Sequence, residues 1–216
     1  MRGMVSDRLT IHAIVRSRRT DRAMDTLIRR ADTPEFDMLV DREIAAIVTR
    51  ESVTNRGRSL QKHSRVVSSL LRRNAVVPMP HGLTASGGEA VLAFLRDERI
   101  PLLEALEYLE DCFEVRIHVS EPGLEWSPTV RRDAGATIFA EARTRSRSAR
   151  LVEGRAGNVL DAAFLIRRGE WIQFVESLSD WERRIGGLCV DVTGPWPAWD
   201  FVQLVPFASN EGEIDE

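Results

Sequence analysis

Strand-type and helix-type segments alternate along this chain in a fixed order, and that order restricts the fold more than any other feature of the sequence. Short runs rich in Val, Ile and Leu predict strands, whereas apolar residues three and four positions apart predict amphipathic helices. For the first half these patterns predict a strand over residues 9–15, a helix over 24–31, a tight hairpin of strands 36–40 and 43–48, a helix over 55–74 and an extended segment over 75–80. The order β-α-β-β-α-β is that of the ferredoxin-like unit.

The second half follows a variation on the same order. Residues 113–119 alternate strictly between apolar and polar side chains, which predicts a strand with one buried face. That face is expected to carry Phe113, Val115, Ile117 and Val119. The other predicted elements are a long helix that begins at Ser86 or Gly87 and is interrupted at Pro101, helices over 133–150 and 170–184, and strands over 159–166 and 188–192.

These patterns predict an α+β protein made of two ferredoxin-like halves. An N-terminal domain is expected over residues 1–82 and a C-terminal α/β domain with helices over 83–207, with the boundary inside the zone 82–112. Residues 208–216 are polar and acidic, which predicts a disordered tail.

Composition and charge exclude several classes of protein. Of the 216 residues, 43% are apolar and 29% are charged, which is typical of a globular chain and not of a disordered or collagen-like one. The net charge of −3 indicates no overall attraction to nucleic acid or to anionic membranes. No signal peptide and no membrane-spanning apolar run are visible, and Cys112 and Cys189 stand far apart. We therefore expect a cytoplasmic protein with reduced thiols.

No motif of catalysis or metal binding is present. The histidines are scattered without the spacing of a metal site, and His63 is expected on the polar side of its helix. Residues 86–88 lack the surroundings of a nucleophilic serine, and the chain has no glycine-rich phosphate loop. The sequence thus predicts no enzyme, no cofactor and no metal. The histidines are His12, His63, His81 and His118.

Arginines cluster after residue 142, and three of them are candidates for partner binding. At helical spacing Arg143, Arg147 and Arg150 would share one face of the helix predicted over 133–150. An RNA-binding role is the alternative, since RNA-binding domains share the ferredoxin-like order, but the first-half strands lack the aromatic pair on which bases stack. The better interpretation is a solvated helix face or a docking face for an acidic partner.

A short segment near the C-terminus has a distinctive composition, Gly-Pro-Trp-Pro-Ala-Trp-Asp-Phe over residues 194–201. Glycine permits backbone angles closed to other residues, prolines stiffen the chain, and the two indoles offer large apolar faces. The segment is either a rigid aromatic contact site or a turn that closes the core. Of these, packing of Trp196 and Trp199 under the sheet is the favoured hypothesis.

Residues 192–201 resemble the ending of the GvpF/GvpL family of gas vesicle accessory proteins. A second block, residues 70–82, is similar to the family's helix followed by a segment of the pattern vlPmrfGt, and residues 113–119 and 158–166 fall in the family's order. The matching family-motif residues are Pro78, Gly82, Gly194, Pro195, Trp196, Pro197, Trp199 and Phe201. The chain departs from the family in its helical region, which is shortened to residues 133–154, and in having Trp199 where a tyrosine is usual.

The resemblance implies a non-enzymatic protein that takes part in gas vesicle assembly and needs no cofactor. It implies binding to the gas vesicle shell protein or to other gas vesicle accessory proteins, in the cytoplasm and at the gas vesicle. The alternative is a ferredoxin-like binding or regulatory module that serves another assembly. Neither nucleic acid nor a membrane is expected as a partner.

Overall fold

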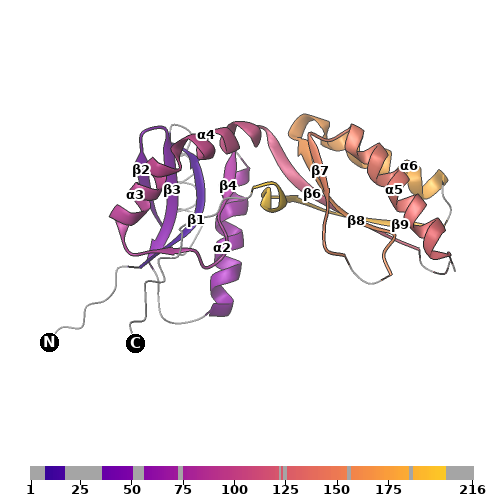
Figure 1. Ribbon diagram of the computed structural model, residues 1–216, viewed down its shortest axis with the longest axis horizontal. Coiled ribbons are helices and arrows are strands. Elements are labelled where there is room, and N and C mark those ends of the chain that lie inside the picture. Colours follow the sequence, from indigo (N-terminus) through magenta and orange to yellow (C-terminus); the bar gives the residue numbers. More distant parts are fainter. Residues whose placement is uncertain are drawn as a thin grey trace, which may run out of the picture. The chain divides into compact units, whose positions relative to one another are not determined.

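The chain folds into two compact units, each built on its own antiparallel sheet (Figure 1). The first unit comprises residues 1–108 with 202–216, and the second comprises residues 109–201. The helices over 88–108 belong to the first unit, and the domain bounds expected from the sequence stay a prediction. The computed structural model describes residues 8–17, 36–50, 56–72, 75–121, 123, 126–154, 157–184 and 187–202.

The first sheet has the strand order β2-β3-β1-β4, and all neighbouring strands are antiparallel. The expected hairpin is confirmed, with Arg42 at a φ of 54° in its tight turn. The helix expected over residues 24–31 lies outside the described residues. The strands are β1 (Leu9–Arg16), β2 (Phe36–Asp41), β3 (Ile44–Arg50), β4 (Val76–Pro78) and the short β5 (Thr84–Ala85), which pairs with β1.

Three described helices complete the first unit: α2 (Arg56–Leu71), α3 (Gly88–Asp97) and α4 (Arg99–Tyr108). The long helix expected after Gly87 is interrupted as predicted, but at Glu98 and not at Pro101. Pro101 lies in the first turn of α4, where the backbone N–H that proline lacks has no partner within the helix. The break therefore comes before the proline, which is accommodated in the first turn of the next helix.

The second unit contains the complete order β-α-β-β-α-β, and its strands are arranged β7-β8-β6-β9. A mixed α+β protein with two antiparallel sheets is thus confirmed, while the ferredoxin-like description of both halves stays a prediction. The elements are β6 (Cys112–Ser120), α5 (Pro128–Thr144), β7 (Ser148–Leu151), β8 (Leu160–Arg167), the 3₁₀ turn η2 (Arg168–Glu170), α6 (Trp171–Arg184), β9 (Cys189–Trp196) and the 3₁₀ turn η3 (Trp199–Phe201).

Helices α5 and α6 lie side by side over one face of the second sheet (Figure 1). The alternating residues of β6 pack there as expected, and Val115 pairs with Phe164 of β8. The ring of Phe164 contacts those of Phe139 in α5 and Phe174 in α6, with centroids 5.8 and 5.6 Å away. This face is the core of the unit. Phe113, Val115, Ile117 and Val119 are all buried, which confirms the prediction.

The helix expected over residues 133–150 is wrong at both ends. It begins at Pro128, because the Ser127 hydroxyl accepts the backbone N–H of Val130 and proline suits the first helical position. It ends at Thr144, and residues 148–151 form the edge strand β7 instead. Residues 144–150 are rich in arginine, which favours helices, and contain no glycine or proline. The sequence therefore gives no strong signal for the end of the helix.

Candidate interaction site

The face of the second sheet opposite α5 and α6 carries charged side chains in register. Arg150 of β7 and Arg116 of β6 both pair with Ala163 of β8, so the three residues form one row across the sheet. Glu114 lies two positions from Arg116 on the same strand and therefore points to the same face. Arg116 Nε donates a hydrogen bond of 2.8 Å to Glu114 Oε1.

Asp200 of η3 is bound by all three of these side chains. Its backbone N–H donates to Glu114 Oε2 at 2.9 Å, and its carboxylate Oδ2 lies 2.8 Å from Arg116 Nη2. Its backbone carbonyl accepts a hydrogen bond from Arg150. These contacts tie the end of the motif segment, residues 194–201, to strands β6 and β7.

Glu114 is fully buried, although its place in an alternating strand predicts exposure. Burial raises the pKa of its carboxyl to about 7, and the nearby Asp200 carboxylate acts in the same direction. The Asp200 N–H and Arg116 oppose this shift with smaller effects. The folded protein therefore favours the protonated acid, so this group's contribution to stability is lost as pH rises from its ordinary pKa of 4.5 through 7.

Truncation of Glu114 should separate its role as a hydrogen-bond acceptor from its charge. Glu114→Ala leaves Arg116 and the Asp200 N–H without their shared partner and opens a cavity, and we expect a loss of about 2 kcal/mol. Glu114→Gln keeps an acceptor oxygen and the side-chain volume, so at pH 6 it should cost less than about 1 kcal/mol. Urea unfolding followed by fluorescence measures both variants; equal losses would show that an amide oxygen cannot replace the carboxyl group in holding the turn.

The motif segment begins inside strand β9, at a glycine that the structure requires, where the pairing with β6 shifts its register. Gly194 has a φ of 134°, and a Cβ there would lie 3.0 Å from the backbone oxygen of Glu114. The Gly194–Pro195 peptide bond is cis. Pro195 is exposed, whereas Pro197 and Ala198 are buried. The segment thus combines an anchored end with an exposed beginning.

Trp196 is 44% exposed, so the favoured hypothesis that its indole packs under the sheet is wrong. Its N–H donates to the Thr193 hydroxyl at 3.2 Å, which holds the ring along the exposed strand. Strand β9 lies at the edge of the sheet, where β6 is its one neighbour among the described strands, and this explains the exposure. Trp199 and Phe201 are half-buried.

The other family-motif residues lie in the first unit. Pro78 is buried at the end of β4, and Gly82 is exposed in the turn that follows. The two motif blocks therefore belong to different units of the protein.

The three arginines predicted to bind a partner do not share a helix face. Arg143 is in the last turn of α5, Arg147 lies in the loop after it, and Arg150 is in strand β7. The shared face required a helix to residue 150, which the structure replaces by a strand. Arg150 binds the carbonyl of Asp200. A role of these residues in partner binding stays a prediction.

Two histidines form a buried pair in the first unit, which the sequence pattern did not indicate. His12 Nδ1 lies 2.9 Å from His63 Nδ1, and His12 Nε2 lies 2.9 Å from the Thr49 hydroxyl. His63 is only 1% exposed, so its expected place on a polar helix face is wrong. Burial is the largest cause that lowers the pKa of His12 to about 3 and that of His63 to about 4. Both imidazoles are neutral at pH 7.

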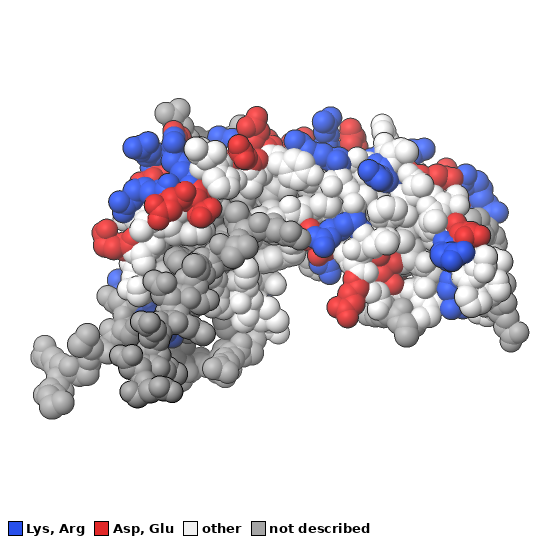
Figure 2. Space-filling model, in the orientation of Figure 1, with Lys and Arg blue, Asp and Glu red and all other residues white. Residues whose placement is uncertain are grey.

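Within the described ranges, no three His, Cys, Asp or Glu side chains are grouped so that they could hold a metal ion. In the same part of the chain, no helix is both long and apolar enough to cross a bilayer. On the face shown in Figure 2, basic and acidic side chains are interspersed, and neither sign forms a continuous surface.

Fold and site together define a two-unit α+β protein with an exposed indole on an anchored C-terminal segment. A family model described as gas vesicle synthesis protein GvpL/GvpF matches residues 12–136 and 125–203. The chain belongs to this family, as its motif residues predicted. Family membership supports a role in gas vesicle formation.

Individual relatives agree with this assignment. Gas vesicle protein F of Haloferax mediterranei is 27% identical over 172 residues, covering 76% of this chain and 79% of the relative. Gas vesicle protein F1 of Halobacterium salinarum is 23% identical over 168 residues, covering 74% of this chain and 78% of the relative. The fold matches the crystal structure of GvpF from Anabaena sp. PCC7120 with a TM-score of 0.73 at 13% identity, covering 92% of this chain and 99% of that one. The crystal structure of GvpF from Microcystis aeruginosa matches with a TM-score of 0.70 at 14% identity, covering 92% of this chain and 100% of that one.

Proposed function

We propose that this protein is a non-enzymatic accessory protein of gas vesicle assembly, which binds the vesicle shell protein or other gas vesicle accessory proteins. It acts in the cytoplasm and at the growing vesicle. The observation that carries the proposal is the exposed indole of Trp196 on an anchored family-motif segment. Tryptophan is enriched among the residues that contribute most to protein–protein binding, because a large rigid surface is buried at little entropic cost.

The anchoring of the segment also favours binding. Asp200 is held by Glu114, Arg116 and Arg150, so the end of the segment is fixed before any partner arrives. A surface that is already ordered loses little conformational entropy on association. The two buried histidines offer no comparable chemistry for catalysis, since their rings are enclosed in the core of the first unit.

The variant Trp196→Ala tests the proposal. Because the indole is 44% exposed, its loss should cost less than about 1 kcal/mol of stability. Binding to the co-expressed shell protein should weaken at least about tenfold, as truncation of a central aromatic residue at an interface commonly does. Ile172→Ala is the control, since Ile172 is 69% exposed on α6 and stands outside the motif. It should bind like the wild type.

Two results would count against the proposal. Complete separation of the wild-type protein from both the shell protein and the accessory proteins at micromolar concentrations would remove the binding function. A Trp196→Ala protein that binds normally but melts well below the wild type would make the indole a structural residue and move the interface elsewhere.

A further inference from the structure

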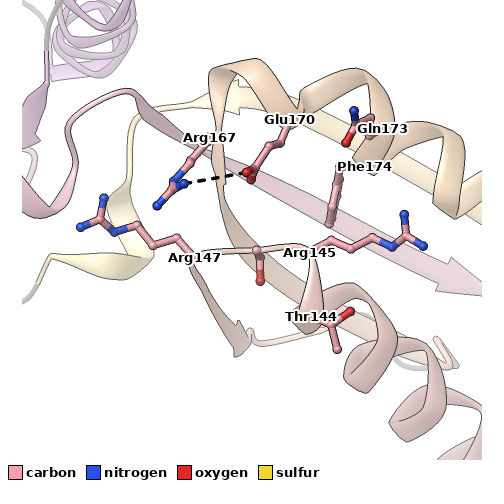
Figure 3. Close-up of a pocket in the computed structure, with 8 residues that line it drawn as sticks. Thr144, Arg145, Arg147, Arg167, Glu170, Gln173 and Phe174 are labelled. Carbon is pink, nitrogen blue, oxygen red and sulfur yellow. Dashed lines mark ion pairs between the residues drawn. The ribbon is translucent and has the colours of Figure 1, made fainter.

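A hollow of about 360 Å³ lies in the second unit, where the end of α5, the loop after it and the start of α6 meet. Three arginines line it, Arg145, Arg147 and Arg167, against a single carboxylate, that of Glu170. In the view of Figure 3 the Arg147 and Arg167 side chains lie at one end of the hollow and Arg145 extends toward the other. Positive charge is therefore presented at two separate places.

The acidic groups nearby neutralise this charge only in part. Glu170 Oε1 lies 3.9 Å from Arg167 Nη1, and both side chains are about half exposed, so the pair is weak. Glu141, the acid near Arg145, is bound more closely by Arg184 at 2.7 Å and by the indole N–H of Trp181. The side chains of Arg145 and Arg167 are exposed and can turn toward a ligand.

A second hollow of about 490 Å³ continues along the same two helices. Arg145 lines both hollows. Arg183 and Arg184 line the second one, where they pair with the carboxylates of Asp180 and Glu141. Together the two hollows form what we call the arginine groove. Its length suits an extended ligand with several negative groups better than one small anion.

The lining also excludes a nucleotide. The aromatic residues among the described lining are Phe174 in the first hollow and Trp181 in the second, and they are 1% and 3% exposed, so neither offers a face on which a base could stack. The Glu170 carboxylate would repel a doubly charged phosphate more strongly than the singly charged carboxylate of a peptide side chain. Arginine pairs with single carboxylates in a planar, bidentate geometry that needs no further donors.

We propose that the arginine groove binds an acidic peptide segment of a partner protein, through Asp or Glu carboxylates that pair with Arg145 and with Arg167. The inference rests on the proposed function, since it names the chemistry of one of the partners. It also moves the partner-binding arginines from the helix face expected in the sequence to the groove between α5 and α6.

Binding of fluorescent hexaglutamate at low ionic strength tests the groove. The double variant Arg145→Gln/Arg167→Gln should raise Kd at least about tenfold, equivalent to about 1.4 kcal/mol. Arg147 is left in place, because it also hydrogen-bonds the buried Cys112 thiol. The charge-matched control Arg96→Gln/Arg132→Gln removes two exposed arginines outside the groove, one in α3 and one in α5, and should change Kd less than about threefold. Arg145→Gln alone repeats the test with one exposed change, should the double variant fold poorly.

Three outcomes would overturn the proposal: no binding of hexaglutamate by the wild type, equal losses in the two double variants, or displacement of the peptide by inorganic phosphate at comparable concentration, which would indicate a small-anion site. The shell-protein pull-down is scored separately. If the wild type binds hexaglutamate but no gas vesicle protein, the groove stands and the proposed function fails; if it binds a gas vesicle protein but not hexaglutamate, the reverse holds.

Discussion

Gly135→Ala is expected to destabilise the second unit by about 3 kcal/mol, although alanine is the better helix former. Gly135 lies in α5, and a Cβ at this position would be 2.4 Å from the backbone oxygen of Val159 and 3.6 Å from its Cγ1. The obstructing atom belongs to the backbone and cannot rotate away. The helix would have to move off the chain that leads into β8, and the packing of α5 on the sheet would be lost with it.

Urea unfolding followed by tryptophan fluorescence measures this loss, because all five tryptophans lie between residues 109 and 201, in the second unit. Gly169→Ala is the matched control, since nothing lies within 4 Å of a Cβ placed there. It should change stability by less than about 0.5 kcal/mol. A Gly135→Ala protein as stable as the control would show that α5 packs less closely than the structure indicates.

Most helices and strands could be predicted from the sequence, because each buries one face and its apolar residues therefore recur at the spacing of a helix or a strand. Strand β6 is the clearest case, and each of its alternating apolar residues is buried. The same rule fails at Glu114, a carboxylate on the polar side of that strand. Its burial comes from Asp200, which is 86 positions away in sequence. No local pattern contains that information.

The candidate site was only partly predictable for the same reason. The motif residues could be named, but their burial depends on which strand stands at the sheet edge. Because β6 is the one described strand that pairs with β9, Trp196 stays exposed and the core hypothesis fails. Arg150 could not be placed either, since only the register of β7 brings it to Asp200. His63 faces the core because His12 stands opposite it on β1.

Mild acid should destabilise the first unit by about 3 to 5 kcal/mol between pH 6.5 and pH 4.5. In the unfolded chain His12 and His63 take up protons near their ordinary pKa of 6.5, whereas the folded protein binds them only near pH 3 and pH 4. Stability is therefore full above pH 6.5 and is lost as pH falls, with a slope of up to about 1.4 kcal/mol per pH unit for each histidine.

The geometry explains why the folded protein resists protonation. The two Nδ1 atoms are 2.9 Å apart, so one must donate a proton and the other must accept it. Protonation of the ring whose Nδ1 accepts would place two N–H groups against each other in a buried site, and protonation of the donor ring at Nε2 would place a positive charge in the same buried site. The charge of Lys62 further lowers the pKa of His12, and the nearby His81 further lowers the pKa of both histidines.

Amide hydrogen exchange of β1 and β3 peptides, measured across this pH range, isolates the first unit, while tryptophan fluorescence reports on the second. His63→Asn keeps a polar atom near the Nδ1 position but cannot titrate, so the slope should fall by about half or more. His81→Asn changes an exposed ring whose centroid lies 5.5 Å from that of His63, and this variant should keep most of the wild-type pH slope. The second unit should show no such loss, because the raised pKa of Glu114 makes its stability rise as pH falls from 7 toward 4.5. If the wild type and His63→Asn lose protection in parallel, the buried pair does not set the acid limit of this fold.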